Sequence, residues 1–187
     1  MVPWSQELFV HRLETQCRRA RVAFERLERM CSAPGASVDE LYEAVDSLVS
    51  QAGKISRFFF PGSTRKGRDP KAVDERANWL RQELGVKDDS IFRCRAVRDH
   101  LEHFDERLHG ADPTTRLVMS GNVGPPGAIF CPNADPLDNF DPSTMTMSFR
   151  NDTLKLGELI REVERVQQEA DRLSRTAREE MSHGLAR

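Results

Sequence analysis

The stretch SIFRCRAVRDHLEHFDERL, residues 90–108, has the strongest helical period in the middle of the chain. Its apolar side chains recur at three- and four-residue steps, which places them on one stripe of an α-helix: Cys94, Val97, Leu101, Phe104 and Leu108. At about 100° per residue, four charged side chains gather on the opposite side: Arg95, Asp99, Glu102 and Glu106. Arg98 and His103 lie on the two shoulders of this ionic face. The stretch therefore predicts an amphipathic helix with a side crowded by titratable groups.

Four more helices are predicted around this stretch, over residues 5–30, from Ser37 to the phenylalanines at 58–60, over 70–84 and over 155–181. Ser37 and Glu40 have the spacing of a capping box, and Asp69 is placed to cap the third helix. Three adjacent phenylalanines cannot all face one core from the end of a helix. Either the chain turns sharply at residues 58–60, or one ring is presented to a partner.

Residues 112–141 are rich in proline and glycine, and residues 144–149 then alternate apolar and polar side chains. This alternation predicts a strand, paired antiparallel with an upstream strand from 116–120 or 128–131. We therefore expect a mainly α protein, a bundle of four to five helices with a small antiparallel β-insertion before the last helix. A single domain is expected, with the bundle in residues 1–110 and 153–182 and the loop-rich insertion in 112–150.

The composition describes a soluble globular chain: 187 residues, 31% charged, 38% hydrophobic, with a net charge of −2. This balance excludes a strongly basic protein that coats nucleic acid, and no segment has the length of a membrane span. The four cysteines are far apart and are expected to be reduced, in a cytoplasmic protein. No spacing of cysteines or histidines suggests a zinc site, so neither metal nor cofactor is expected.

The residues Arg98-Asp99-His100-Leu101-Glu102-His103 fit the Arg-x4-His form of the motif that HEPN domains carry. The stretch resembles this superfamily, and in particular a group of poorly characterised bacterial HEPN-like proteins. The resemblance implies a helical bundle that dimerises and acts as a metal-independent ribonuclease in toxin–antitoxin or antiviral systems. It makes His103 the acid–base group for the 2′-hydroxyl proton and Arg98 the phosphate clamp, with Asp99 as the polar residue after the arginine. Active members most often have asparagine at that position.

Several alternatives remain open at this stage. Arg95, His100 and Glu102 either support the catalytic pair or belong to an ion-pair lattice on a helix surface, and His100 competes with His103 as the functional histidine. The basic loop with Arg65, Lys66 and Arg68 either binds phosphate or is simply solvated. The expected partners are a second copy of the chain, RNA and a cognate antitoxin. The competing function is a non-catalytic HEPN-like module that binds a partner protein.

Overall fold

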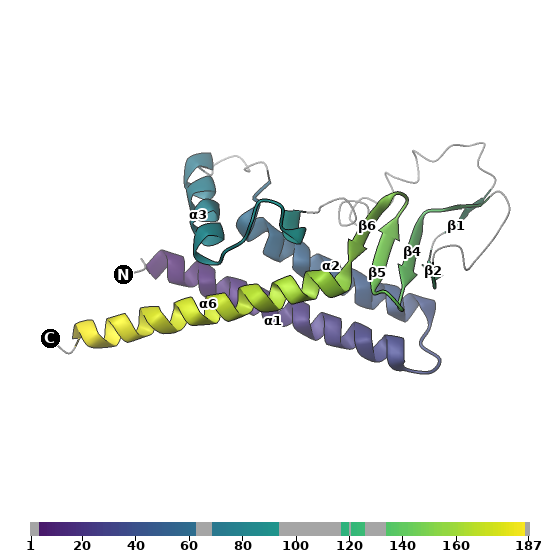
Figure 1. Ribbon diagram of the computed structural model, residues 1–187, viewed down its shortest axis with the longest axis horizontal. Helices are drawn as coiled ribbons and strands as arrows, with labels where there is room; N and C mark the ends of the chain where they lie inside the picture. Colours follow the sequence, from purple (N-terminus) through teal and green to yellow (C-terminus); the bar gives the residue numbers. More distant parts are fainter. Residues whose placement is uncertain (1–3, 63–68, 94–116, 120, 126–133, 186–187) are drawn as a thin grey trace.

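A computed structural model of the protein describes residues 4–62, 69–93, 117–119, 121–125 and 134–185 (Figure 1). Within these residues the chain forms four α-helices: α1 (Trp4–Ser32), α2 (Val38–Phe59), α3 (Pro70–Glu83) and α6 (Leu156–Leu185). A 3₁₀ turn, η1 (Ile91–Arg93), follows α3, and a small sheet precedes α6. The expectation of a mainly helical protein with a small sheet before its last helix is confirmed. Among the described helices, none is long and apolar enough to cross a membrane.

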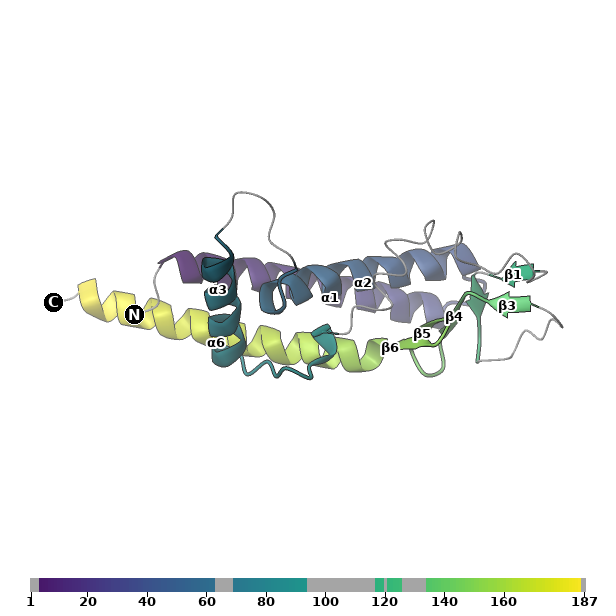
Figure 2. The same cartoon turned by 90° about the horizontal axis from the view of Figure 1, so that it is seen from above.

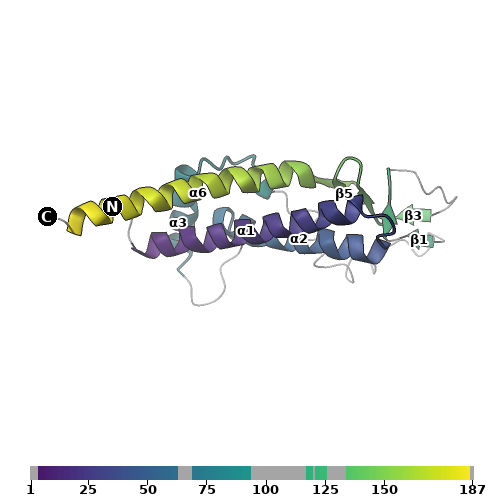
Figure 3. The same cartoon turned by 90° about the horizontal axis from the view of Figure 1, so that it is seen from below.

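Three long helices, α1, α2 and α6, lie side by side in all three views (Figures 1, 2 and 3). Helix α1 runs towards the sheet, and α2 and α6 both run back towards the end where the two termini lie (Figure 1). Their facing sides form the core, whose fully buried side chains include Leu13, Cys17, Leu27, Val45, Leu48, Ile55, Val163 and Val166. These are the positions that the helical period placed on apolar stripes. The pattern was informative because each helix buries one continuous face.

The boundaries of α2 and α3 follow from their caps. The Ser37 hydroxyl accepts a hydrogen bond from the Glu40 amide at 3.2 Å, and the Glu40 carboxylate accepts one from the Ser37 amide at 2.9 Å. The expected capping box is thus confirmed. The Asp69 carboxylate accepts a hydrogen bond from the Lys71 amide at 3.0 Å and caps α3, which lies across the long helices (Figure 2).

A turn of the chain at the end of α2 allows the three adjacent phenylalanine rings to be accommodated. Helix α2 ends at Phe59, and Phe60 leaves the helical conformation with φ −129° and ψ 74°. Phe59 is fully buried and stacks on Phe92 of η1, with ring centroids 5.6 Å apart. Phe60 is also buried, and Phe58 packs partly buried against the core. The first of the two alternatives, a sharp turn, is therefore the one observed.

The sheet differs from the predicted one in its pairing. Strand β5 (Thr146–Phe149) pairs antiparallel with β4 (Asp138–Asp141) and with β6 (Asp152–Lys155), so neither predicted upstream segment is its partner. The antiparallel pairing of the strand is confirmed, and the choice of partner is wrong. A four-residue turn joins β4 to β5, and such a short loop costs less entropy to close than a pairing with a more distant strand.

The other strands make the sheet mixed rather than antiparallel. Strand β2 (Asn122–Val123) pairs parallel with β4, and β1 (Leu117–Met119) pairs parallel with β3 (Ala134–Pro136) in a separate two-stranded unit. The expectation of an entirely antiparallel insertion is therefore wrong. Residues 128–131 lie outside the described residues. The predicted alternation holds in β5, where Met147 and Phe149 are fully buried, whereas Met145 adopts φ +49° in the preceding turn.

Candidate functional site

The residues that the sequence singled out for chemistry lie outside the described part of the chain. This applies to the motif residues Arg98, Asp99 and His103, to their neighbours Arg95, His100 and Glu102, and to the basic loop with Arg65, Lys66 and Arg68. Of the stretch 90–108, the structure describes Ser90 and the η1 turn that follows it. The catalytic assignments therefore stay predictions. The site that can be built from described residues is the one around η1.

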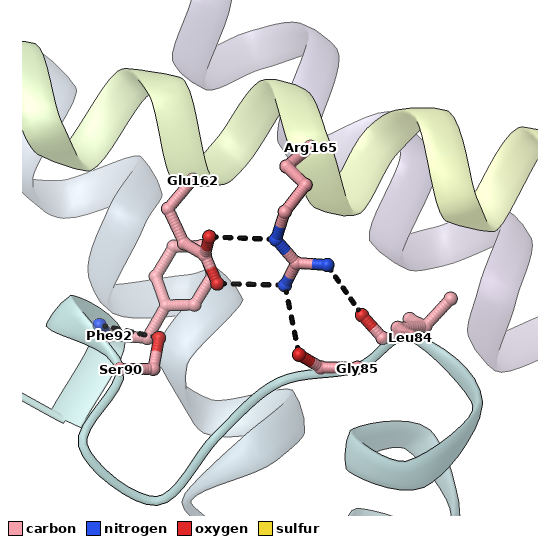
Figure 4. Close-up of polar contacts among 6 residues, drawn as sticks. All are labelled: Leu84, Gly85, Ser90, Phe92, Glu162 and Arg165. Carbon is pink, nitrogen blue, oxygen red and sulfur yellow. Dashed lines mark hydrogen bonds and ion pairs between the residues drawn. The ribbon is translucent and has the colours of Figure 1, made fainter.

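The segment that leads to η1 is attached to α6 by one arginine (Figure 4). The Arg165 guanidinium donates hydrogen bonds to the carbonyl oxygens of Leu84, at 2.9 Å, and Gly85, at 3.3 Å. It also donates two bonds of 2.8 Å to the Glu162 carboxylate, which raise the pKa of Arg165 above its ordinary value. Carbonyls at the end of a helix have no intrahelical partner, so this cation caps α3.

The other end of the segment is fixed by Phe92. Its ring is buried against Phe59, and its amide donates a hydrogen bond of 3.4 Å to the Ser90 hydroxyl. The Arg93 amide donates one of 2.8 Å to the Ser90 carbonyl. Contacts at Arg165 and at Phe92 therefore hold this segment at both ends. These contacts fix the backbone of Arg93, which follows Phe92 directly.

Arg93 lies in the wall of a solvent-open hollow of about 630 Å³ between the end of α2, helix α3 and η1. We call this feature the cationic hollow; its lining residues are Phe59, Phe60, Pro61, Asp74, Ala77, Asn78, Arg81 and Arg93. Its volume falls within the range of about 300–1,000 Å³ that is usual for sites of small ligands. The three segments that form it all lie within residues 59–93, and α3 lies between the other two along the chain.

Two guanidinium groups share one aromatic ring in this hollow. The Cζ atoms of Arg81 and Arg93 lie 5.2 and 5.9 Å from the centroid of the Phe60 ring, within the range of cation–π contacts. Arg81 also pairs with the Asp88 carboxylate at 3.3 Å and donates a hydrogen bond to the Asn78 side-chain oxygen. Arg93 donates to the Asp88 carbonyl at 3.3 Å. Both guanidinium groups therefore have contacts that orient them in the absence of a ligand.

The donors of these arginines are only partly used. A guanidinium carries five N–H donors, and among the described residues Arg93 makes one hydrogen bond. Asp88 is largely exposed, so its pairing with Arg81 is a weak surface contact that a stronger anion can displace. Asp74 is a second carboxylate, in the lining of the same hollow. The hollow can therefore accept one anionic group, and Asp74 opposes the approach of a second one.

A second polar cluster ties the sheet to α2 and has a structural role. The Tyr42 hydroxyl donates to the Asn122 carbonyl at 2.9 Å and lies 3.2 Å from the buried Asp138 carboxylate, which also accepts from the Gly121 amide. Burial and the Asp138 charge hold the pKa of Tyr42 far above its ordinary value, so this phenol keeps its proton and serves as a hydrogen-bond donor. Burial and the same charge raise the pKa of Asp46.

Sequence reasoning missed most of the cationic hollow. Arg93 and His100 form one of the four pairs in the chain with the spacing Arg-x(4–6)-His, but Arg81, Asn78 and Phe60 carry no local signal. The one clue was the run of phenylalanines, since a ring at the end of a helix can pack against the core and still contact nearby cations. Among the described residues, no group of three or more His, Cys, Asp or Glu side chains is arranged to hold a metal ion.

Comparisons of this chain with protein-family models, with curated proteins and with solved structures found no match.

Proposed function

We propose that this protein is a HEPN-like, metal-independent endoribonuclease of a bacterial toxin or antiviral defence system. The observation that carries the proposal is the position of Arg93 in the cationic hollow, because Arg98 of the Arg-x4-His motif follows it by only five residues. A nuclease needs cations that hold the RNA backbone beside the groups that cleave it. The mainly helical fold is also the one that the resemblance implies.

In this proposal the motif residues divide the chemistry of cleavage between them. His103 removes the proton of the 2′-hydroxyl group, whose oxygen attacks the adjacent phosphorus. Arg98 stabilises the charge of the pentacoordinate phosphorane. Asp99 stands where active HEPN members most often have asparagine, and its carboxylate stabilises the positive charge that His103 acquires when it takes the 2′-hydroxyl proton. The bond from phosphorus to the 5′-oxygen then breaks, and the protonated His103 returns its proton to that oxygen. The products are a 2′,3′-cyclic phosphate and a free 5′-hydroxyl group.

Cleavage of total RNA by the wild-type protein and by His103→Ala tests this assignment. We expect the wild type to cleave in the presence of EDTA and to leave 2′,3′-cyclic phosphate ends, and His103→Ala to be inactive. His11→Ala is the matched control, because His11 is an exposed histidine of α1 outside the motif. Equal cleavage by wild type and His103→Ala contradicts the assignment. Intact RNA with the wild type favours the competing function, a non-catalytic module that binds a partner protein.

The proposed site is shared between two copies of the chain. The face with Arg95, Asp99, Glu102 and Glu106 carries both signs of charge, so it is self-complementary across a two-fold axis. Two copies would bring two Arg98–His103 pairs to one groove. Sedimentation at micromolar protein and moderate salt tests the dimer. A monomer under these conditions contradicts the shared site without excluding RNA binding.

A further inference from the structure

We infer that the cationic hollow is a binding site for one phosphate group of an RNA strand, held by Arg93 and Arg81. The inference rests on the proposed function for the identity of the ligand. It goes beyond that function in assigning the site to residues outside the motif. The group recognised is a phosphate, and both an RNA backbone and a free nucleotide carry one.

The first argument is geometric. A phosphate oxygen pair fits the planar fork of a guanidinium, and two such forks lie over one ring at the wall of an open hollow. The Phe60 ring is buried, and both guanidinium groups contact it. Since the arginines are already ordered, little side-chain entropy is lost when a ligand binds.

The second argument is electrostatic. Two guanidinium groups near one ring repel each other, and among the described residues Asp88 is the carboxylate that pairs with one of them, Arg81. Asp88 is mostly in water, where its attraction for Arg81 is weak. An anion between the two arginines relieves their repulsion. Asp74 also lines the hollow, and its charge opposes a second phosphate there, so the hollow accepts one phosphate of the strand.

The third argument concerns accessibility. Arg93 is exposed and Arg81 is partly exposed, so the free N–H groups can reach a ligand that stays largely in solvent. A strand of RNA can place one phosphate in the hollow while the rest of its backbone passes over the surface. A deep pocket would admit only a free nucleotide, whereas this hollow is open.

Binding is measured by fluorescence anisotropy with a labelled single-stranded RNA of about 12 nucleotides. All proteins carry His103→Ala, so that the RNA stays intact. We expect Arg93→Ala and Arg81→Ala each to raise the Kd about tenfold. The slope of log K against log salt should fall by about 0.7 for each RNA phosphate that the variant no longer neutralises. Arg93→Lys should be intermediate, because it keeps the charge and loses the fork.

Arg29→Ala is the matched control, since it removes one exposed arginine from the last turn of α1, at the sheet end of the molecule (Figure 1). Asp74→Asn should tighten RNA binding, because it removes the opposing charge. Thermal melting verifies that each variant is folded. If Arg93→Ala and Arg81→Ala bind RNA as Arg29→Ala does, the inference is wrong.

Competition separates the sources of the phosphate. Unlabelled RNA should displace the probe far better than a mononucleotide, inorganic phosphate or a polyglutamate peptide. Displacement by a mononucleotide at equal concentration overturns the assignment to an RNA strand in favour of a free nucleotide. Equal displacement by polyglutamate overturns it in favour of an acidic protein segment.

The inference and the proposed function can fail separately. Binding that depends on Arg93, by a protein that never cleaves RNA, supports the hollow and contradicts the nuclease. Cleavage that depends on His103, with normal RNA binding by the Arg81 and Arg93 variants, supports the nuclease and contradicts the phosphate site in the hollow.

Discussion

Replacing Arg165 with alanine should release the segment that carries Arg93 from helix α6. The change removes two hydrogen bonds from a charged donor to the Leu84 and Gly85 carbonyls. A hydrogen bond to a charged group contributes about 1.5–3 kcal/mol when it is well shielded. Here the Arg165 side chain is 39% exposed and one bond is 3.3 Å long, so we expect a loss of about 1–2 kcal/mol in total.

Arg172→Ala provides a matched control on the same helix. Arg172 bonds Glu169 three residues earlier at 2.9 Å, as Arg165 bonds Glu162, but among the described residues its guanidinium reaches no other segment. Its removal should cost less than about 0.5 kcal/mol. Each arginine has an ion pair with a glutamate three residues earlier, but only Arg165 also bonds the end of α3. The difference in stability between the two variants therefore measures the contribution of that cap.

Thermal and urea unfolding measure this difference. For a chain of this length, about 1–2 kcal/mol corresponds to a fall in Tm of roughly 2–8 °C. Amide hydrogen exchange should accelerate in residues 84–93 of Arg165→Ala and stay unchanged there in Arg172→Ala. If both variants lose the same stability, the carbonyl contacts contribute nothing measurable and the reasoning is refuted.

Three further predictions concern the sheet and the core. Tyr42→Phe removes a hydroxyl donor beside the buried Asp138 carboxylate, so we expect a loss of about 1–2 kcal/mol in urea unfolding; an unchanged midpoint would contradict the structural role of this cluster. Because the folded pKa of Asp46 is raised, its ionised form destabilises the fold, and this cost appears as the pH rises through that pKa. Asp46→Asn should therefore raise the Tm at neutral pH and give no gain below the ordinary aspartate pKa of 3.8, whereas an equal gain at both pH values would contradict the cause. Burial raises the pKa of Cys17 to about 12, so a thiol reagent at neutral pH should label Cys31 well before Cys17, as peptide mapping would show.

The helices could be predicted because their signals are local. The capping box of Ser37 and Glu40 spans four residues, and each apolar stripe repeats within a single helix. The core seams follow directly from these stripes, since a helix with one apolar face must pack that face against another. The start of α6 was less clear, because Asp152–Lys155 forms strand β6 where only a lead into the helix was expected.

The pairing of the sheet could not be predicted, because its central strand has a weak pattern. Strand β4 has the sequence DNFD, in which Phe140 is the only apolar side chain, so it did not suggest a strand. Its place is set by contacts outside the strand. Phe140 is buried in the common core, and the Asp138 carboxylate accepts hydrogen bonds from Gly121 and from Tyr42 of α2. Such partners are distant in sequence and leave no periodic signal.

The cationic hollow could not be predicted for a similar reason, because its residues come from separate elements. Its formation nevertheless depends on the run of phenylalanines at residues 58–60, which the sequence analysis had singled out. Because α2 ends at Phe59, consecutive rings take different directions: Phe59 stacks on Phe92 in the core, and Phe60 lies beneath the guanidinium groups of Arg81 and Arg93. The stacking on Phe92 positions the backbone that carries Arg93, and the next ring binds that arginine's own side chain. One turn of the chain therefore couples the packing of the core to the arrangement of charge at the surface.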